Sequence, residues 1–165
     1  MSIRLDRCAP ETVAVVDAGV GEARRLGRSW VGTEHFLFGF AGDHRALVPD
    51  AVARVLPPAT AVRAGLGPAA EAGSDVLVER RRRPWRRARR CGDSESGELR
   101  LAPRAKEALH VAARHSERRG AGMIEPVDLL VGIVDVAGSG ANRVLVDAGV
   151  APGQVRAALR DSTGQ

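Results

Sequence analysis

RSWVGTEHFLFGF (residues 28–40) and AGMIEPVDLLVGI (residues 121–133) are two stretches of this 165-residue chain that share one apolar rhythm. Their apolar residues recur three and four positions apart, which is the spacing of one face of an α-helix. Each stretch therefore predicts a short helix with a buried face. The apolar positions that the two stretches share are Phe36/Leu129, Leu37/Leu130 and Phe40/Ile133.

The likeness extends toward the N-terminus of both stretches. CAPETVAVVDAGVGEARRLG, from residue 8, aligns with LAPRAKEALHVAARHSERRG, from residue 101, without a gap and at the same offset of 93 residues. Self-similarity at a fixed offset indicates a duplicated structural unit. The identical pairs are Ala9/Ala102, Pro10/Pro103, Arg25/Arg118, Gly27/Gly120, Leu37/Leu130 and Gly39/Gly132.

Signals for the start and the end of helices stand at matching places in the two copies. Proline suits the first turn of a helix, as at Pro10 and Pro103, and Gly27 and Gly120 are placed to end that helix. In the first copy the helix contains Gly19 and Gly21, each of which costs about 1 kcal/mol relative to alanine, so we expect it to be weak.

A second helix follows in each copy, and two shorter amphipathic segments come after it. We expect Thr33 to be the N-cap of the second helix in the first copy, and Pro126 to take the first helical position in the second copy. Helices this short are marginal alone, so the copies must pack on each other. The shorter segments are residues 50–56 and 59–66, then 141–149 and 152–159.

The predicted fold is therefore all-α, a single domain built from two pseudo-two-fold repeats of four helices. Residues 5–68 form repeat 1, residues 99–161 form repeat 2, and residues 69–98 form an Arg-rich linker that we expect to be flexible. Only 3% of the residues are aromatic, so small aliphatic side chains must fill the core. Such side chains favour closely packed helices.

The positive charge is concentrated in the linker. The chain has a net charge of +5, and RRRRPWRRARR (residues 80–90) contributes eight arginines, which leaves −3 for the rest. Three interpretations stay open: a solvated linker, a site for an acidic partner or nucleic acid, and docking on the domain's own acidic surface. The candidate polyanion-binding residues are Arg80, Arg81, Arg82, Arg83, Trp85, Arg86, Arg87, Arg89 and Arg90.

Patterns typical of enzymes and metal sites are missing from the sequence. It has no G-x-x-x-x-G-K-[ST] phosphate loop, and His110 and His115 are five apart, so they do not share a helix face. We predict no catalytic activity, no cofactor and no metal. With two isolated cysteines, Cys8 and Cys91, no signal-peptide pattern and no membrane-length apolar run, we expect a cytoplasmic protein with free thiols and no membrane partner.

EARRLGRSWVGTEHFLFGF (residues 22–40) and LAPRAKEALHVA (residues 101–112) resemble the repeat starts of the Clp N-terminal domain family. These are the substrate- and adaptor-binding modules of the ClpA and ClpC chaperones, and their fold is two four-helix repeats. The resemblance covers most of residues 5–56 and 99–160 and does not include the central linker. It implies a free-standing homologue without ATPase modules.

Some ClpC-type N-domains bind phosphorylated arginine, and the resemblance implies that Glu34 would bind the guanidinium through charge-assisted bonds. The counterpart of Glu34 is Val127, and alanines stand where the family often has a threonine, at Ala9 and Ala102. At most half of a paired site is thus implied. The alternative for Glu34 and His35 is a structural role at the helix start. The candidate ligand-binding residues are Thr33, Glu34, His35 and Lys106.

Two functional hypotheses follow. The first is a non-catalytic protein- or peptide-binding module that acts as an adaptor, a substrate receptor or a decoy in Clp proteolysis. Its partners would be Clp ATPase or protease components, adaptors, substrate proteins or small molecules directed at N-domains. The second is a nucleic-acid- or polyanion-binding protein that uses residues 80–90, with binding that weakens steeply as salt rises.

Overall fold

The computed structural model describes residues 5–67 and 100–163. In these two ranges the chain forms eight α-helices, and β-structure is limited to one pair of two-residue strands and an isolated bridge. The predicted all-α class is confirmed. The candidate residues Arg80–Arg90 and Trp85 lie outside the described ranges. The helices are α1 (Pro10–Arg25), α2 (Thr33–Ala41), α3 (Asp50–Val55), α4 (Ala59–Gly65), α6 (Pro103–Arg118), α7 (Pro126–Asp135), α8 (Gly140–Asp147) and α9 (Pro152–Thr163).

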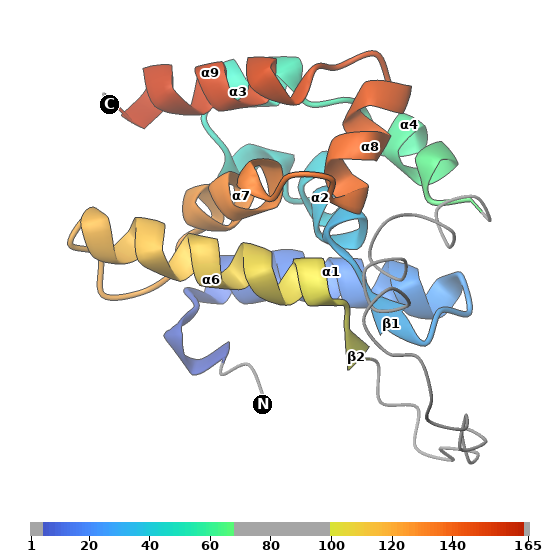
Figure 1. Cartoon of the computed structure of the whole chain (residues 1–165), viewed down its shortest axis with the longest axis horizontal. Helices are drawn as coiled ribbons and strands as arrows, with labels where there is room; N and C mark the ends of the chain where they lie inside the picture. Colours follow the sequence, from blue (N-terminus) through green and yellow to red (C-terminus); the bar gives the residue numbers. More distant parts are fainter. Residues whose placement is uncertain (1–4, 68–99, 164–165) are drawn as a thin grey trace, which may run out of the picture.

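The two repeats match element by element. Helices α1 and α6 are both 16 residues long and start at prolines 93 positions apart. Gly27 and Gly120 follow them with φ angles of +67° and +70°, a left-handed conformation in which glycine is favoured. Figure 1 shows three tiers, with α1 and α6 below, α2 and α7 in the middle, and α3 and α9 above. The duplication read from the sequence is therefore a duplication of structure.

Short parallel strand contacts interlock the repeats. Strand β1 (Trp30–Val31) pairs with β2 (Arg100–Leu101), so that Val31 lies opposite Leu101. An isolated bridge between Cys8 and Ile124 repeats this contact at an offset of 93. Each repeat thus begins by pairing with the segment that precedes the second helix of the other repeat. This exchange makes one domain of the described parts of the two repeats.

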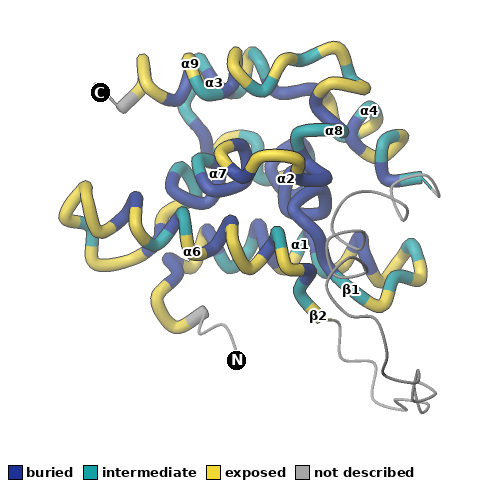
Figure 2. The backbone as a smooth tube through the Cα atoms, viewed as in Figure 1, coloured by how far each residue is buried: buried dark blue, intermediate teal, exposed yellow. Residues whose placement is uncertain are grey.

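The core is formed mainly by α2 and α7 and by the sides of α1 and α6 that face them. Buried residues gather in the middle tier and exposed residues lie on the outer sides of α6 and α9 (Figure 2). Gly39 and Gly132 lie at close helix crossings, because a Cβ on them would overlap the carbonyl oxygens of Val15 and Ala108. This overlap explains in physical terms why both repeats have glycine at that position.

Helix α1 is continuous despite its two glycines. Gly21 has open space around it, whereas a Cβ on Gly19 would lie 2.7 Å from the carbonyl oxygen of His35. The sequence predicts only the cost of Gly19 for the helix. The structure adds that glycine at this position lets α2 approach α1.

The N-cap predicted for α2 is wrong. Gly32 is the N-cap, and its N–H donates to Nδ1 of His35 over 3.0 Å. Thr33 is the first helical residue, and its hydroxyl oxygen accepts a hydrogen bond from the N–H of Ala141 over 3.1 Å. A contact with a residue so distant in sequence overrides the local preference of threonine for the cap.

Within residues 5–67 and 100–163, no single helix is both long and apolar enough to cross a membrane. Helices α7 and α8 satisfy that criterion only as a pair, bent by 84°.

Candidate functional site

The carboxylate of Glu34 is enclosed where α2 meets the start of α8. Its side chain is 2% exposed. A Cβ on Gly32 or Gly140 would overlap the carboxylate, so the backbone of both glycines closes directly over it. The Thr33 hydroxyl lies 3.5 Å from Oε2. For Thr33 and Glu34 to bind a ligand, the start of α8 would first have to move away.

His35 closes the start of α2. Its Nδ1 accepts the N–H of Gly32 and lies 3.4 Å from Oε1 of Glu34. Because Nδ1 accepts a hydrogen bond, the ring proton lies on Nε2. Trp30 packs edge-to-face against the ring, with the centroids 5.8 Å apart. Among the described residues Nε2 has no hydrogen-bond partner, so His35 has a clear capping role at Nδ1 and none at Nε2.

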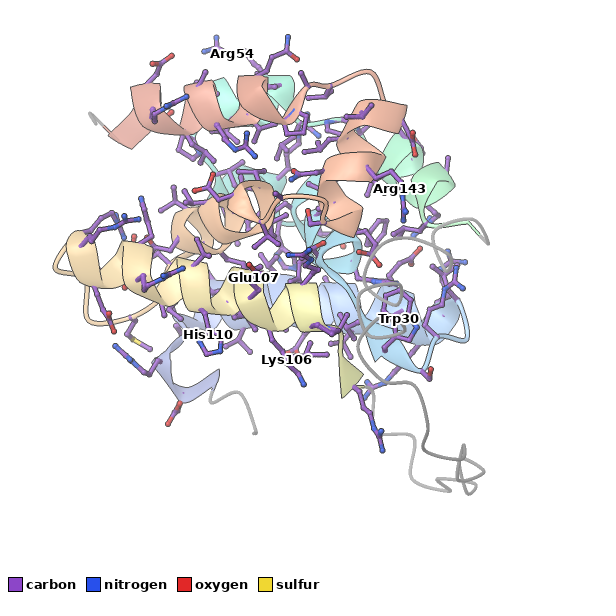
Figure 3. All side chains as sticks on the ribbon, in the orientation of Figure 1. Trp30, Arg54, Lys106, Glu107, His110 and Arg143 are labelled. Atoms are coloured by element: carbon purple, nitrogen blue, oxygen red, sulfur yellow. The ribbon has the colours of Figure 1, made fainter. Side chains whose placement is uncertain are left out.

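Lys106 is separate from these residues. It is exposed on α6, and its side chain extends from the side of that helix away from α2 and α8 (Figure 3). The structure thus brings Thr33, Glu34 and His35 together and leaves Lys106 apart.

Asp128 occupies the place of His35 in the second repeat. It is fully buried, and its Oδ2 accepts the N–H of Glu125 over 2.9 Å, as His35 accepts that of Gly32. Its Oδ1 also lies 2.6 Å from Nδ1 of His115 and 3.1 Å from Nε of Arg119. These two partners of Asp128 were not predicted from the sequence. The same capping task is therefore done by different side chains in the two repeats.

An open cleft lies at the counterpart of Glu34, where the second repeat has Val127. Its volume is about 720 Å³. The start of α1, the segment before α3, the start of α7 and the end of α9 surround it, so both repeats contribute to its walls. From the sequence, Ala9 and Val127 are only departures from a family motif and Pro126 only a helix start, so the cleft was not predicted. The lining residues are Ala9, Glu11, Leu47, Pro49, Arg119, Glu125, Pro126, Val127 and Ser162.

Solved structures show what this architecture resembles. The N-terminal domain of the caseinolytic protease associated chaperone ClpD from Arabidopsis thaliana matches with a TM-score of 0.71 and 19% identity, over 99% of each chain. The Hsp104 N-terminal domain from Candida albicans matches with a TM-score of 0.58 and 13% identity, over 95% of this chain and 91% of that chain. A structure described as part of a malarial protein secretion system matches with a TM-score of 0.60 and 15% identity, over 94% of each chain.

The chain has a Clp N-domain-like fold. No family model matches the sequence, and the search of curated proteins finds no match either. At 13–19% identity, the likeness to these Clp and Hsp104 N-terminal domains is one of fold.

In this Clp N-domain-like fold, repeat 1 holds a buried carboxylate between two arginines. Glu22 is 3% exposed at its side chain and accepts two hydrogen bonds from Arg25, over 2.8 and 2.6 Å. Arg63 of α4 donates two more, over 2.8 and 3.2 Å. The hydrogen bonds from Arg25, with those from Arg63, lower the pKa of Glu22 from 4.5 to about 2 against the opposing effect of burial. Glu22 is thus ionised at neutral pH and ties α4 to α1.

Replacing Glu22 by glutamine is expected to lower the free energy of unfolding at pH 7 by about 2 kcal/mol. Because the pKa is depressed in the folded chain, the ionised carboxylate stabilises the fold above pH 4.5, and this contribution is lost as the pH falls toward 2. This expected loss is smaller than the pKa shift alone would give, because both arginines are about half exposed to solvent.

Urea unfolding at pH 7 and pH 3 measures this effect, and the difference between Glu22→Gln and the unchanged chain should shrink at pH 3. Glu107→Gln is the matched control, since Glu107 is 51% exposed in a surface pair with Arg104, and it should change stability by no more than about 0.5 kcal/mol. A difference for Glu22→Gln that is the same at both pH values would contradict the assignment.

Cys8 is a packing residue in this structure. It is 4% exposed and lies in a small cluster with Ala112 and Ile124. Burial raises the pKa of its thiol, and the charge of Asp6 raises it further, so the reactive thiolate is disfavoured at neutral pH. Within the described parts of the chain, no group of three His, Cys, Asp or Glu side chains is arranged to hold a metal ion.

Proposed function

We propose that the chain is a non-catalytic protein- and peptide-binding module that engages Clp ATPase or protease components, adaptors or substrate proteins. It would act as an adaptor, a substrate receptor or a decoy in Clp proteolysis. The match to N-terminal domains of Clp-type chaperones over nearly their whole length supports this class of function. The cleft beside Val127 is the observation that carries the proposal, because it offers an open surface in this fold.

The chemistry of the cleft favours an apolar segment with a basic flank. Its apolar walls include Leu47, Pro49 and Val127. Two carboxylates, Glu11 and Glu125, also line it, against the one guanidinium of Arg119. That guanidinium is already engaged, at 2.6 Å from Glu125 and at 3.1 Å from Asp128. A peptide that inserts an apolar side chain and places an arginine or lysine beside it would be complementary in shape and charge.

Thr33, Glu34 and His35 remain a second candidate site in this proposal, and Lys106 lies apart from them. A guanidinium or phosphoarginine ligand there would need α8 to move, so its binding should be slow and should expose Gly140 and Ala141 to hydrogen exchange. The Val127 cleft needs no such movement. We therefore place the main binding surface at the cleft.

Val127→Arg is expected to reduce the capture of Clp components from native lysate by at least about tenfold. The long cation fills the cleft and repels a basic ligand. Val146→Arg is the matched control, because Val146 is 60% exposed on α8 and outside the cleft lining. Capture at about 0.3 M salt, followed by mass spectrometry, measures the effect while weakening phosphate-dominated contacts.

Enrichment of Clp chaperones, proteases, adaptors or their substrates by the unchanged chain and by Val146→Arg, with loss in Val127→Arg, supports the proposal. Absence of every such component contradicts it. If Val127→Arg captures as much of these proteins as the unchanged chain does, the Val127 cleft is not the binding surface. Nucleic acid as the only retained partner, lost when residues 80–90 are deleted, would instead favour the polyanion-binding function.

A further inference from the structure

A cavity in repeat 2 lies between α6, α7 and α9. Its volume is about 200 Å³, which admits a side chain but not a folded element. Three arginines line it, together with one carboxylate and an apolar wall. It is distinct from the Val127 cleft, with which it shares no lining residue. The lining residues are His115, Arg118, Val131, Val134, Asp135, Arg156, Leu159 and Arg160.

The offset of 93 residues places this cavity at the counterpart of the Glu22 cluster in repeat 1. Arg118 and Arg156 correspond to Arg25 and Arg63, which hold Glu22 through four hydrogen bonds of 2.6–3.2 Å. The apolar side is also preserved, since Leu159 corresponds to the buried Leu66 and Val131 to Phe38. In repeat 1, therefore, the two arginines at these positions bind a carboxylate.

Repeat 2 keeps the two arginines but has no carboxylate at the position of Glu22. The counterpart of Glu22 is His115, whose Nδ1 is bonded to Asp128 over 2.6 Å. Within the described ranges, no hydrogen bond or ion pair of the Arg118 side chain is found. Arg156 donates to Asp135 over 3.1 Å and to the carbonyl oxygen of Val134 over 2.6 Å.

The charge of the lining is positive. Three arginines, Arg118, Arg156 and Arg160, line the cavity together with one acidic residue, Asp135, which is paired with Arg156. An anion that enters the cavity would meet the guanidinium of Arg118, the counterpart of Arg25, whereas the Nε and Nη2 groups of Arg156 already donate to Asp135 and Val134. Guanidinium groups hold carboxylates well because their planar forks allow two parallel charge-assisted hydrogen bonds.

We propose that this cavity binds the carboxylate of an acidic peptide, with an aspartate or glutamate entering between Arg118 and Arg156. The apolar wall of Val131, Val134 and Leu159 would hold a neighbouring apolar side chain of the same peptide. This site lies outside the Val127 cleft and has the opposite charge preference. The two proposals can therefore fail independently.

The test is an NMR titration of the full chain, labelled with ¹⁵N, using the peptide acetyl-Leu-Glu-Leu-amide. Shifts are expected at the residues that line the cavity and at the Nε–H signals of Arg118 and Arg156. Acetyl-Leu-Gln-Leu-amide is the neutral probe and should bind at least about tenfold more weakly, since it lacks the charge-assisted bonds. Inorganic phosphate is a third probe, which distinguishes a carboxylate site from a phosphate site.

Arg118→Gln should weaken binding of the acidic peptide about tenfold, and Arg118→Lys should give an intermediate affinity because the charge remains without the fork. Arg54→Gln is the matched control: Arg54 is exposed on α3, does not line the cavity, and carries the same charge change (Figure 3). Equal binding of the neutral peptide, or unchanged binding in Arg118→Gln, would overturn the proposal. Binding of phosphate without binding of the acidic peptide would overturn it as well.

Discussion

Gly132→Ala is expected to lower the free energy of unfolding by about 3 kcal/mol. A Cβ at this position would overlap the carbonyl oxygen of Ala108 and lie 3.0 Å from its carbonyl carbon and 3.1 Å from the nitrogen of Ala112. All three atoms belong to the backbone of α6, so relief requires α6 and α7 to separate. In an exposed helix the same change would stabilise the chain by about 1 kcal/mol. The sign of the change in the free energy of unfolding therefore shows whether α6 and α7 pack closely at this position.

Urea unfolding followed by circular dichroism measures this change. Gly21→Ala is the control, because Gly21 is exposed within α1 and has no atom within 4 Å of an added Cβ. The free energy of unfolding of Gly21→Ala should rise by about 0.5–1 kcal/mol. Gly39→Ala should behave like Gly132→Ala, since it meets Val15 in the same way. A Gly132→Ala variant as stable as the unchanged chain would contradict the close crossing of α6 and α7.

Asp128→Ala is expected to be the most damaging change to a polar residue in the described part of the chain, with a loss of about 3–4 kcal/mol. The substitution removes the acceptor for His115, for Arg119 and for the N–H of Glu125. His115 is 8% exposed at its side chain, so water does not readily replace the lost partner. The start of α7 also loses its cap.

The same unfolding measurement applies, with Asp147→Ala as the control. Asp147 is exposed at the end of α8, and its removal should change stability by no more than about 0.5 kcal/mol. Asp128→Asn keeps the shape of the side chain and one acceptor oxygen, so its loss of stability should lie between those of Asp128→Ala and Asp147→Ala. Similar stability for Asp128→Ala and Asp147→Ala would show that the His115–Asp128–Arg119 network does not support the fold.

The fold was predictable from local signals that the two repeats share. Pro10 and Pro103 start helices of equal length, and Gly27 and Gly120 end them in the left-handed conformation. These signals depend only on the backbone preferences of proline and glycine, so sequence is enough to read them. Thr33 was assigned the wrong role because the cap is decided by His35, three residues beyond the N-cap, and by a distant contact with α8.

The candidate site was less predictable because distant segments form it. Glu34 was named from a motif, but its burial depends on Gly140, which lies over one hundred positions away. The Val127 cleft depends in the same way on the segment before α3. A sequence signal did exist for the arginine pair of repeat 2, because extending the same offset of 93 aligns Arg63 with Arg156. It becomes informative only when Glu22 is known to be held by both Arg25 and Arg63.

A photo-crosslinking amino acid placed at residue 127 tests the proposed function most directly. Val127 is partly exposed in the cleft, so the probe reports what contacts that surface without requiring tight binding. In native lysate, with residue 146 on α8 as the control position, the proposal predicts crosslinks from position 127 to Clp chaperone, protease, adaptor or substrate proteins and none of these from position 146. Identical crosslinking patterns from the two positions, or no Clp-related protein at position 127, would contradict it.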